Sequence, residues 1–306
     1  MERGVLVVGE SLVDVVRRPD GSTETFPGGS AANVAVALAR LGRDAGFVTS
    51  FADDEHGRLI ADHLAASHVR LVTDPHVVPR TSSALATIGP DGSASYTFDI
   101  DWRIGQVDLE TDPLAVHGCS LGAVVTPGAA DVRALFARLR SGTTTSYDVN
   151  MRPSVTGVGR EVTATVERMV ALSDLVKASD EDLEALYPGL SVGDAAGRLL
   201  ELGASAVVVT RGSDGASWYA DDMEVHAPGV VVEVADTIGA GDTFGAAMLD
   251  ALGTRDVLGP DGHDHLAHVE SQQVEDVLLW ATRAAAITVS RPGADPPRRT
   301  ELEPGS

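Results

Sequence analysis

Short apolar runs alternate with helical stretches along most of the chain. Residues 5–8 form an apolar run that ends at Gly9, and Ser30 precedes an alanine-rich stretch that ends before Gly42. Four-residue apolar runs are typical of buried parallel strands, and Ser and Gly commonly flank a helix. The alternation predicts further strands at 47–49, 69–72, 123–125, 144–149, 175–176 and 206–209, and helices at 57–66, 132–139, 162–172, from 180 and up to 202. This pattern predicts an α/β fold with a mainly parallel central sheet covered by helices on both faces.

Two segments depart from this alternation and have the pattern of antiparallel hairpins. Residues 81–88 and 93–100 alternate apolar and polar positions around Pro90-Asp91-Gly92, and residues 13–26 surround Asp20-Gly21. We expect lid hairpins at about 13–27 and 80–103, which would cover a site or form a homodimer through their strands. The polar, His-rich stretch at about 253–271 is predicted to be a surface insertion. Residues 1–298 would form one domain, followed by a flexible tail at 299–306.

The composition is that of a globular protein with a strong negative charge. The chain has 306 residues, of which 43% are hydrophobic, and its formal net charge is −22. Such a surface repels phosphate backbones and anionic lipids, so no nucleic acid and no membrane are expected as partners. The sequence shows no signal peptide or membrane-spanning run, and Cys119 is its only cysteine. We therefore expect a cytoplasmic protein.

Lys177 is the only lysine, and its surroundings exclude several nucleotide-binding motifs. It lies between Val176 and Ala178, so it belongs neither to a Gly-Lys-Ser/Thr P-loop nor to the strand motif of protein kinases. If this protein uses ATP, it binds ATP without a P-loop.

The strongest chemical signal lies between residues 236 and 249. The sequence Asp236-Thr237-Ile238-Gly239-Ala240-Gly241-Asp242 follows an apolar run at 230–232, which predicts a strand, and precedes a predicted helix. The small residues at 239–241 let backbone N–H groups contact an anion, and Asp242 would accept a proton from an attacking hydroxyl. The alternative is an ordinary acidic helix start, since Asp is favoured near the positive end of a helix dipole.

A second glycine-containing segment lies near the start of the chain. Gly28 and Gly29 precede a helix that carries Asn33 on its first turn, and Asp14 follows the first predicted strand. Glycines admit a ligand close to the backbone, and amide and carboxylate groups suit the recognition of hydroxyls. The alternatives are a glycine turn before a helix and a carboxylate at a strand end.

Together these segments resemble the PfkB, or ribokinase-like, family of carbohydrate kinases, and most closely its fructokinase-like branch. The resemblance covers nearly all of residues 1–298, with the segments in the family's order. They are Gly9-Glu10 with Asp14, Gly28-Gly29-Ser30-Ala31-Ala32-Asn33, Phe51-Ala52-Asp53-Asp54 with Gly57, Asp148-Val149-Asn150-Met151-Arg152-Pro153, Thr210-Arg211-Gly212-Ser213-Asp214-Gly215, Asp236 to Asp242, and Gly293-Ala294. The resemblance implies a three-layer α/β/α sandwich with a small β lid, and an ATP-dependent sugar kinase.

The resemblance also implies roles for individual residues. The family's functional positions fall on Asp242 (catalytic base), Gly239, Ala240 and Gly241 (anion hole), Asp14, Gly28, Gly29 and Asn33 (sugar hydroxyls), Thr210, Gly212 and Gly215 (ATP), and Asp236, the carbonyl of Ile238, Ser290 and Gly293 (a monovalent cation such as K⁺). The implied cofactors are ATP and Mg²⁺, with K⁺ in many relatives.

One segment departs from the family pattern. Many relatives have Asn-x-x-Glu, associated with magnesium and phosphate, where this chain has Ser179 and Asp182. We expect Ser179 to contact ATP and Asp182 to hold Mg²⁺ through water. Lys177, just upstream, either approaches a nucleotide phosphate or is a surface lysine at a strand end.

The segment around Arg152 bears on the identity of the sugar. Arg152 would bind the carboxylate of an acid sugar or organise the site through Asp148, and an intramolecular ion pair is the alternative. The lid hairpin that ends in Tyr96-Thr97-Phe98-Asp99 resembles the lids of fructokinases. Fructose is therefore the expected substrate, with a 2-keto-3-deoxygluconate kinase or a ribokinase-type kinase as alternatives. A non-catalytic sugar- or nucleotide-binding regulator is a further alternative, against which the complete motif at Asp242 argues.

Two other patterns suggest different chemistry. Gly118-Cys119-Ser120-Leu121-Gly122 matches the nucleophile elbow of hydrolases, but the predicted strand at 123–125 comes after it rather than before. His263, His265 and His268 with Asp264 have the composition of a metal site, yet they lie in the predicted insertion, where a solvated loop is the expected structure.

Overall fold

A central sheet of nine strands organises the protein. The computed structural model describes residues 4–89, 94–221 and 223–303. The strand order is β13-β12-β11-β10-β9-β8-β1-β4-β5, and all pairs from β11 to β5 are parallel. The strands are β1 (Val5–Val8), β4 (Ala45–Val48), β5 (Arg70–Leu71), β8 (Ala115–Cys119), β9 (Thr144–Asp148), β10 (Leu175–Ser179), β11 (Ala206–Thr210), β12 (Ala216–Ala220) and β13 (Met223–Ala227).

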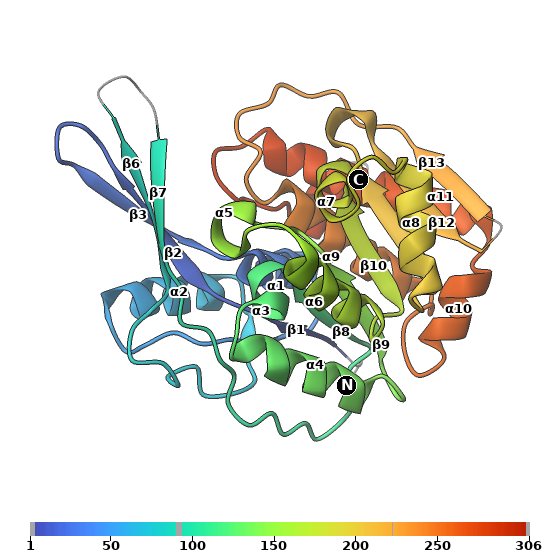
Figure 1. Cartoon of the computed structure of the whole chain (residues 1–306), viewed down its shortest axis with the longest axis horizontal. Coiled ribbons are helices and arrows are strands. Elements are labelled where there is room, and N and C mark those ends of the chain that lie inside the picture. The colour runs from blue at the N-terminus through green and yellow to red at the C-terminus, as the bar shows by residue number, and fades with distance from the viewer. Residues whose placement is uncertain (1–3, 90–93, 222, 304–306) are drawn as a thin grey trace.

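Helices cover both faces of this sheet and complete the three-layer sandwich (Figure 1). One hydrophobic cluster joins the sheet to α1 (Ser30–Arg40), α2 (Glu55–Ala66), α9 (Ala240–Thr254) and α11 (Ser271–Val289). A second cluster joins it to α3 (Ser120–Val124), α4 (Gly128–Leu139), α6 (Arg160–Val170), α7 (Asp180–Leu186) and α8 (Val192–Glu201). The strands between the layers are buried on both sides, which explains their uninterrupted apolar runs.

A smaller sheet projects from one edge of the sandwich (Figure 1). Its order is β3-β2-β6-β7, from β2 (Leu12–Arg17), β3 (Thr23–Gly28), β6 (Ser83–Ile88) and β7 (Ala94–Asp99). The two hairpins are antiparallel and meet through a parallel β2–β6 pair, so the predicted lid hairpins form one sheet. The predicted turn at 90–92 lies outside the described residues.

Two predicted strands are wrong, and in each the apolar run has another cause. Residues 120–124 form α3, which directly follows β8, so the apolar residues at 123–125 pack from a helix end rather than a strand. Residues 230–232 form an irregular loop, in which Val231 is 99% exposed. The sequence did not predict the antiparallel hairpin of β12 and β13 at the edge of the sheet.

The ends of two predicted segments are also more ordered than expected. The region at 253–271 contains the end of α9 and the helix α10 (Gly262–His268). The predicted tail contains α12 (Arg299–Leu302), where Leu302 is fully buried and Arg299 donates to the carbonyl of Leu41 and to Asp250. These contacts join the segment after residue 298 to the body of the protein.

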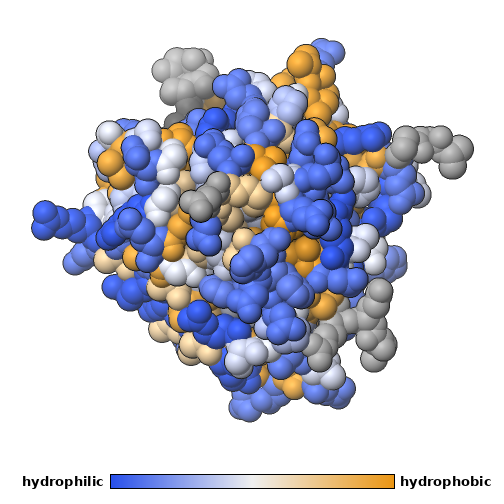
Figure 2. Space-filling view, turned by 90° about the vertical axis from the view of Figure 1, so that its right-hand side faces the viewer, coloured by the Kyte–Doolittle hydropathy of each residue, from blue (hydrophilic) through white to orange (hydrophobic). Residues whose placement is uncertain are grey.

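The face of the molecule shown in Figure 2 is mainly hydrophilic. On the face in Figure 2, hydrophobic residues form small groups between larger hydrophilic areas. Among the helices described, none has the length and hydropathy needed to span a bilayer.

Candidate active site

Asp242 lies in the first turn of α9, where three side chains hold its carboxylate. The Ser30 hydroxyl donates to Oδ1 at 2.6 Å, and Asn33 donates from Nδ2 to Oδ2 at 2.8 Å. Asn150 Nδ2 donates to Oδ1 at 3.3 Å and to the Ser30 hydroxyl at 2.8 Å. The helix starts after Gly239, which has a left-handed backbone with a φ of 75°. These contacts fix the direction of a carboxylate that is only 5% exposed.

Ser30 and Asn150 are site residues to which the sequence assigned no role. They lie 212 and 92 positions from Asp242 in the chain, so no local spacing connects them. Asn150 has a φ of 36°, which is uncommon for a residue with a side chain. Its place within the Asp148–Pro153 motif was the available signal. A strained backbone next to a reactive carboxylate is typical of functional sites.

A polar cavity of about 360 Å³ opens beside Asp242, and we call it the acceptor pocket. It lies between the lid sheet, the start of α1 and the start of α9. Its lining residues are Glu10, Leu12, Asp14, Gly29, Ser30, Asn33, Ala84, Phe98, Ser120, Leu121, Asn150, Arg152, Val155, Thr237, Ile238, Gly239, Gly241 and Asp242. Carboxylate, amide and hydroxyl groups from five separate segments thus converge on one space, as the recognition of a polyhydroxylated ligand requires.

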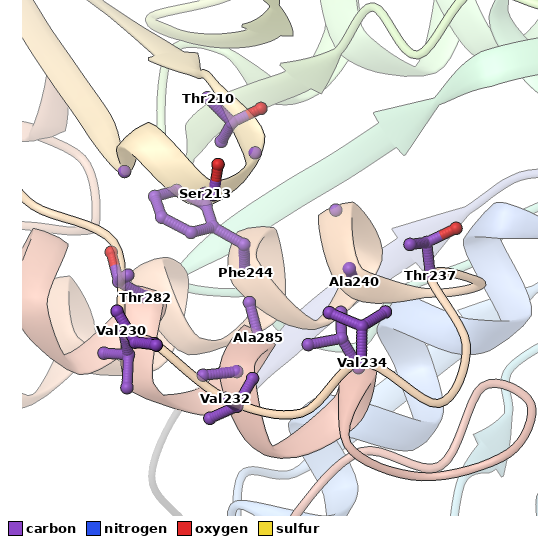
Figure 3. Close-up of a pocket in the computed structure, with 16 residues that line it drawn as sticks. Thr210, Ser213, Val230, Val232, Val234, Thr237, Ala240, Phe244, Thr282 and Ala285 are labelled. Atoms are coloured by element: carbon purple, nitrogen blue, oxygen red, sulfur yellow. The ribbon is translucent and has the colours of Figure 1, made fainter.

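An apolar cavity of about 370 Å³ lies on the other side of the α9 start, and we call it the nucleotide pocket (Figure 3). Its lining residues are Thr210, Gly212, Ser213, Gly215, Val230, Val231, Val232, Val234, Thr237, Ala240, Gly241, Phe244, Thr282, Ala285, Ala286 and Val289. Val230, Val231, Val232 and Val234 belong to a loop that we call the valine loop, which forms one wall of this pocket. The strand predicted at 230–232 lies within this loop. Phe244 points from α9 toward the turn that carries Ser213 (Figure 3). An apolar slot of this kind suits a flat aromatic base.

Gly241 lines both pockets and marks their junction. Within the described residues, the backbone N–H groups of Gly241 and Asp242 have no acceptor, as in the first turn of any helix. Free amides at the positive end of a 15-residue helix attract an anion. An anionic group at this junction would lie between the contents of the two pockets and beside the Asp242 carboxylate.

The predicted sugar-binding glycines differ in their geometry. Gly29 has a φ of 103° and lines the acceptor pocket, and a Cβ there would lie 2.8 Å from the Glu10 carbonyl oxygen. A Cβ at Gly28 would lie 2.3 Å from Asp14 Oδ2, so Gly28 makes room for the Asp14 side chain. Gly28 thus acts on the pocket through Asp14, which lines it.

Two carboxyl groups in the acceptor pocket are desolvated. Burial raises the pKa of Asp14 above its usual value. Burial also raises the pKa of Glu10 to about 7, and the negative charge of Asp242 adds to this rise. The hydrogen bond from the Gly122 amide and the positive charge of Arg152 act in the opposite direction. Glu10 is only 2% exposed, and sequence reasoning gave it no role.

Lys177 is a buried residue whose side chain is paired. It is 4% exposed in β10, and its Nζ lies 2.8 Å from Asp148 Oδ2 on the neighbouring strand β9. The expected alternative of a surface lysine is therefore wrong. Asp148 pairs with Lys177 and not with Arg152, so Arg152 does not organise the site through Asp148.

Arg152 lines the acceptor pocket without an acidic partner among the described residues. Its Nη1 donates to the Met151 carbonyl at 2.9 Å and to the Asn150 carbonyl at 3.5 Å. The alternative of an intramolecular ion pair is wrong within that part of the chain. Both bonds attach the guanidinium to the loop that carries Asn150.

Ser179 and Asp182 form the capping box of α7. Asp182 Oδ2 accepts from the Ser179 amide, and Oδ1 accepts from the Met151 amide. Each carboxylate oxygen thus accepts one backbone hydrogen bond, which holds Asp182 in the cap. Its remaining lone pairs are compatible with the predicted contact to Mg²⁺ through water. Elsewhere in the described ranges, no group of three or more His, Cys, Asp or Glu could hold a metal ion.

The predicted monovalent-cation positions come from two adjacent loops. Asp236 accepts from the amide of Ile238 through Oδ1 and from the amide of Gly293 through Oδ2, while the Asp236 amide donates to the Val289 carbonyl. The Ser290 hydroxyl donates to the Ile287 carbonyl. The two loops therefore meet, which is the arrangement that a site built from backbone carbonyls needs.

The two other patterns gain no support as active sites. Ser120 does follow a strand and begin a helix, with a φ of 48°, so the reason given above against an elbow is wrong. Its hydroxyl, however, donates to the Asn150 carbonyl, and no histidine bonds it in the described chain. His263 lies in α10 and bonds Ser205 and Asp174, and the predicted solvated loop is wrong there.

The comparisons with known proteins agree with this geometry. The model of the pfkB family of carbohydrate kinases matches residues 2–301. A fructokinase of Rhizobium leguminosarum bv. trifolii is 36% identical over 262 residues, covering 81% of this chain and 79% of that protein. Among solved structures, a fructokinase of Xylella fastidiosa with bound ATP superposes with a TM-score of 0.85 at 27% identity, covering 99% and 97% of the two chains. A double-mutant fructokinase of Vibrio cholerae O395 with fructose, ADP and potassium reaches 0.80 at 28% identity, covering 99% and 98%. With two pockets that meet at the glycines before Asp242 and a matching model over almost its full length, the chain belongs to the pfkB family of carbohydrate kinases.

Proposed function

We propose that this carbohydrate kinase is an ATP-dependent fructokinase. The observation that carries the proposal is the position of Asp242, whose carboxylate lies where a polar acceptor pocket and an apolar nucleotide pocket meet. Fructose would occupy the acceptor pocket between Asp14, Asn33 and Asp242. The base of ATP would lie against Phe244 and the valine loop, with its phosphates directed past Thr210 and Gly212 toward Gly241.

The transfer follows from these positions. Asp242 takes the proton of the fructose hydroxyl as that oxygen attacks the γ-phosphorus, and the bond from phosphorus to the bridging oxygen of ADP breaks. The free amides of Gly241 and Asp242 receive the negative charge of the phosphoryl group in flight. Mg²⁺ bound to the triphosphate would neutralise charge on the β- and γ-phosphates, with Asp182 reaching it only through water. The lid would exclude water from the acceptor pocket.

Potassium is a proposed ligand of the loops at Asp236 and Gly293. The hydrogen bonds of Asp236 hold these loops against each other just before the turn at 239–241, which we call the anion-binding turn. A cation there would fix the turn that starts α9. We expect K⁺ to raise activity more than Li⁺ at equal ionic strength, and equal rates in both salts would remove this part of the proposal.

The lid sheet is the proposed contact between two copies of the chain. Phe26 on β3 and Tyr96 on β7 are 49% and 62% exposed, and Tyr96 stacks on Phe98. Both β3 and β7 are edge strands with unpaired backbone groups along one side. Sedimentation should give a dimer that Tyr96→Glu weakens, whereas a monomeric wild type at high concentration would contradict this contact.

The decisive test is ADP release from ATP and Mg²⁺ with a panel of sugars. The panel contains fructose, 2-keto-3-deoxygluconate, ribose, tagatose 6-phosphate and adenosine, and Asp242→Asn serves as the matched inactive control. We expect a strong response to fructose alone. A response to the keto acid alone would instead identify Arg152 as a carboxylate ligand and overturn the choice of fructose. Sugar-induced thermal stabilisation without any turnover would favour a regulator.

A further inference from the structure

The chain places its only lysine in the middle of the central sheet. Lys177 belongs to β10, and the single hydrogen bond of its side chain within the described residues goes to Asp148 on β9. Lys177 and Asp148 are 4% and 1% exposed as side chains, so the pair is removed from water. Arginine supplies every other cationic side chain of the sequence. A compact ammonium group thus occurs at one position, and that position is buried.

Stability alone does not explain this pair. Removing two charges from water costs more than their attraction returns unless further hydrogen bonds satisfy them, and apolar residues of similar volume are often at least as stable. Asp148 Oδ1 has no hydrogen-bond partner in the described structure. The pair is therefore incompletely satisfied, which is the condition under which a buried ion pair is costly to the fold.

The ammonium group lies directly behind the anion-binding turn. A Cβ at Gly241 would be 3.4 Å from Lys177 Nζ, and no other heavy atom outside its chain neighbourhood lies within 4 Å of that position. A Cβ at Gly245 would be 3.8 Å from Lys177 Cδ. Because residues four apart share one face of a helix, the two glycines open that face of α9 along the length of the lysine side chain.

The surrounding groups keep Lys177 charged. Burial lowers its pKa, but the charge and hydrogen bond of Asp148 outweigh burial and leave the pKa above the usual value, with smaller contributions from Asp182 and Asp242. Burial raises the pKa of Asp148 to about 6 even against the attraction of Lys177. Nearby His117 is neutral, since burial and, to a smaller extent, the charge of Lys177 lower its pKa to about 3. At neutral pH the pair is thus an ammonium beside a carboxylate.

We propose that Lys177 is a positioning residue for the transferred phosphoryl group, acting through the backbone of Gly241. This inference rests on the proposed phosphotransfer. The fixed ammonium increases the positive potential at the free amides of the turn, on the side of α9 opposite to the incoming phosphate. Such a charge acts strongly because water is excluded, and it needs no reorganisation during the reaction. Asp148 holds the ammonium in place, and the glycines allow its approach.

The test compares the wild type, in which Asp148 keeps Lys177 charged, with a variant that lacks the ion pair. The double variant Asp148→Asn/Lys177→Met removes both charges and leaves no unpaired charge behind. Relative to wild type, we expect the double variant to lose about 10- to 100-fold in kcat, comparable to or somewhat less than the loss of one oxyanion donor, with KM for fructose within about twofold. Its melting temperature should stay close to that of the wild type.

Nucleotide affinity, measured by calorimetry without sugar, supplies a readout that a structural role would not change. The double variant should bind ATP about tenfold more weakly than the wild type does, while its affinity for ADP, which lacks the γ-phosphate, stays within about twofold. Wild-type kcat and ATP affinity in the double variant would show that the pair is only structural. An equal loss of ATP and ADP affinity would also overturn the proposal.

Two controls separate failure of this inference from other failures. If the double variant does not fold, Asp148→Asn/Lys177→Gln replaces the ion pair with a hydrogen-bonded amide pair. We expect the same losses of kcat and ATP affinity in this variant, and wild-type values in it would overturn the proposal. If the wild-type protein phosphorylates no sugar in the panel, the proposed function fails. The ratio of ATP to ADP affinity then still measures the effect of Lys177 on the γ-phosphate position.

Discussion

The two pockets on either side of Gly241 are almost equal in volume, about 360 and 370 Å³, and opposite in chemistry. The acceptor pocket is lined by charged, amide and hydroxyl side chains from distant segments. The nucleotide pocket is lined mainly by valines, alanines and Phe244, with Thr and Ser residues and no charged side chain among its lining residues. Substitutions should therefore act differently on the two sides. The acceptor pocket depends on a few irreplaceable groups, whereas the nucleotide pocket depends on an apolar area to which each residue adds little.

The largest effect should follow from the loss of the Asp242 carboxylate, which lines the acceptor pocket next to the junction at Gly241. Asp242→Asn removes the general base but keeps a side chain that accepts from Ser30 or Asn33, so we expect kcat to fall by about 10²- to 10⁴-fold. Fructose affinity should stay nearly constant. Steady-state kinetics would measure kcat, and calorimetry would measure the affinity for fructose. Unchanged turnover would remove Asp242 from the mechanism.

The second effect concerns the titration of Glu10, a buried carboxyl group of the acceptor pocket, and its influence on the free energy of unfolding. Burial raises the pKa of Glu10 from 4.5 to about 7, so the native state favours the protonated form, and the stability this contributes below pH 4.5 is lost as pH rises to 7. Glu10→Gln stays neutral. We expect its free energy of unfolding, relative to wild type, to rise by about 3 kcal/mol between pH 4.5 and 8, because one pKa unit corresponds to about 1.4 kcal/mol.

Urea titrations of both proteins across this range provide the measurement for Glu10. The amide oxygen of Gln keeps an acceptor for the Gly122 amide, so the contact itself is preserved. Parallel stability curves for the two proteins would show that Glu10 titrates normally.

A third, smaller effect concerns the orientation of the base. Asn150→Gly removes the amide that donates to Asp242 and Ser30 but suits the backbone, because glycine readily adopts a φ of 36°. We expect kcat to fall about tenfold, the usual value of one hydrogen bond to a charged group, with KM for ATP unchanged. Rate measurements over a range of ATP concentrations would check both values, and a rise in KM for ATP instead would assign Asn150 to the other pocket.

The smallest effect is expected on the apolar side. Val234 is 60% exposed and lines the nucleotide pocket, so Val234→Ser should raise KM for ATP by about threefold through the loss of a few tens of Å² of apolar contact. Val158, 63% exposed and outside both pockets, is the matched control as Val158→Ser. The same KM for ATP in both variants would contradict a base-binding role for the valine loop.

The parts of this protein that were predictable from sequence are those that local patterns determine. The motif at Asp242 can be recognised from sequence because the small residues, the carboxylate and the helix are adjacent in the chain. The hydrogen bonds from Ser30 and Asn150 connect residues far apart in the chain, so spacing could not reveal them. The apolar run at 230–232 is compatible both with a buried strand and with the wall of a pocket. Only the position of the ligand site decides between them.

Lys177 and α12 show two other limits of the sequence. A lone lysine after a strand looks the same whether its ammonium reaches solvent or a buried partner, since Asp148 belongs to a different strand. The four residues of α12 are too few to show a helical period, and their contacts are to distant parts of the chain: Leu302 is buried, and Arg299 donates to the Leu41 carbonyl and to Asp250. In both cases the surrounding fold, rather than local propensity, determines the structure.

The location of Asp14 within the lid sheet would connect recognition of the substrate to movement of the lid. Asp14 belongs to β2, which pairs with β3 on one side and β6 on the other, and Ala84 and Phe98 of the lid line the same pocket. A ligand that bonds both Asp14 and Asp242 would therefore join the four-stranded sheet to α9, and such a ligand would shift the population of lid positions toward a closed one. In that case the reach of the substrate, and not the exclusion of water alone, would favour transfer over hydrolysis.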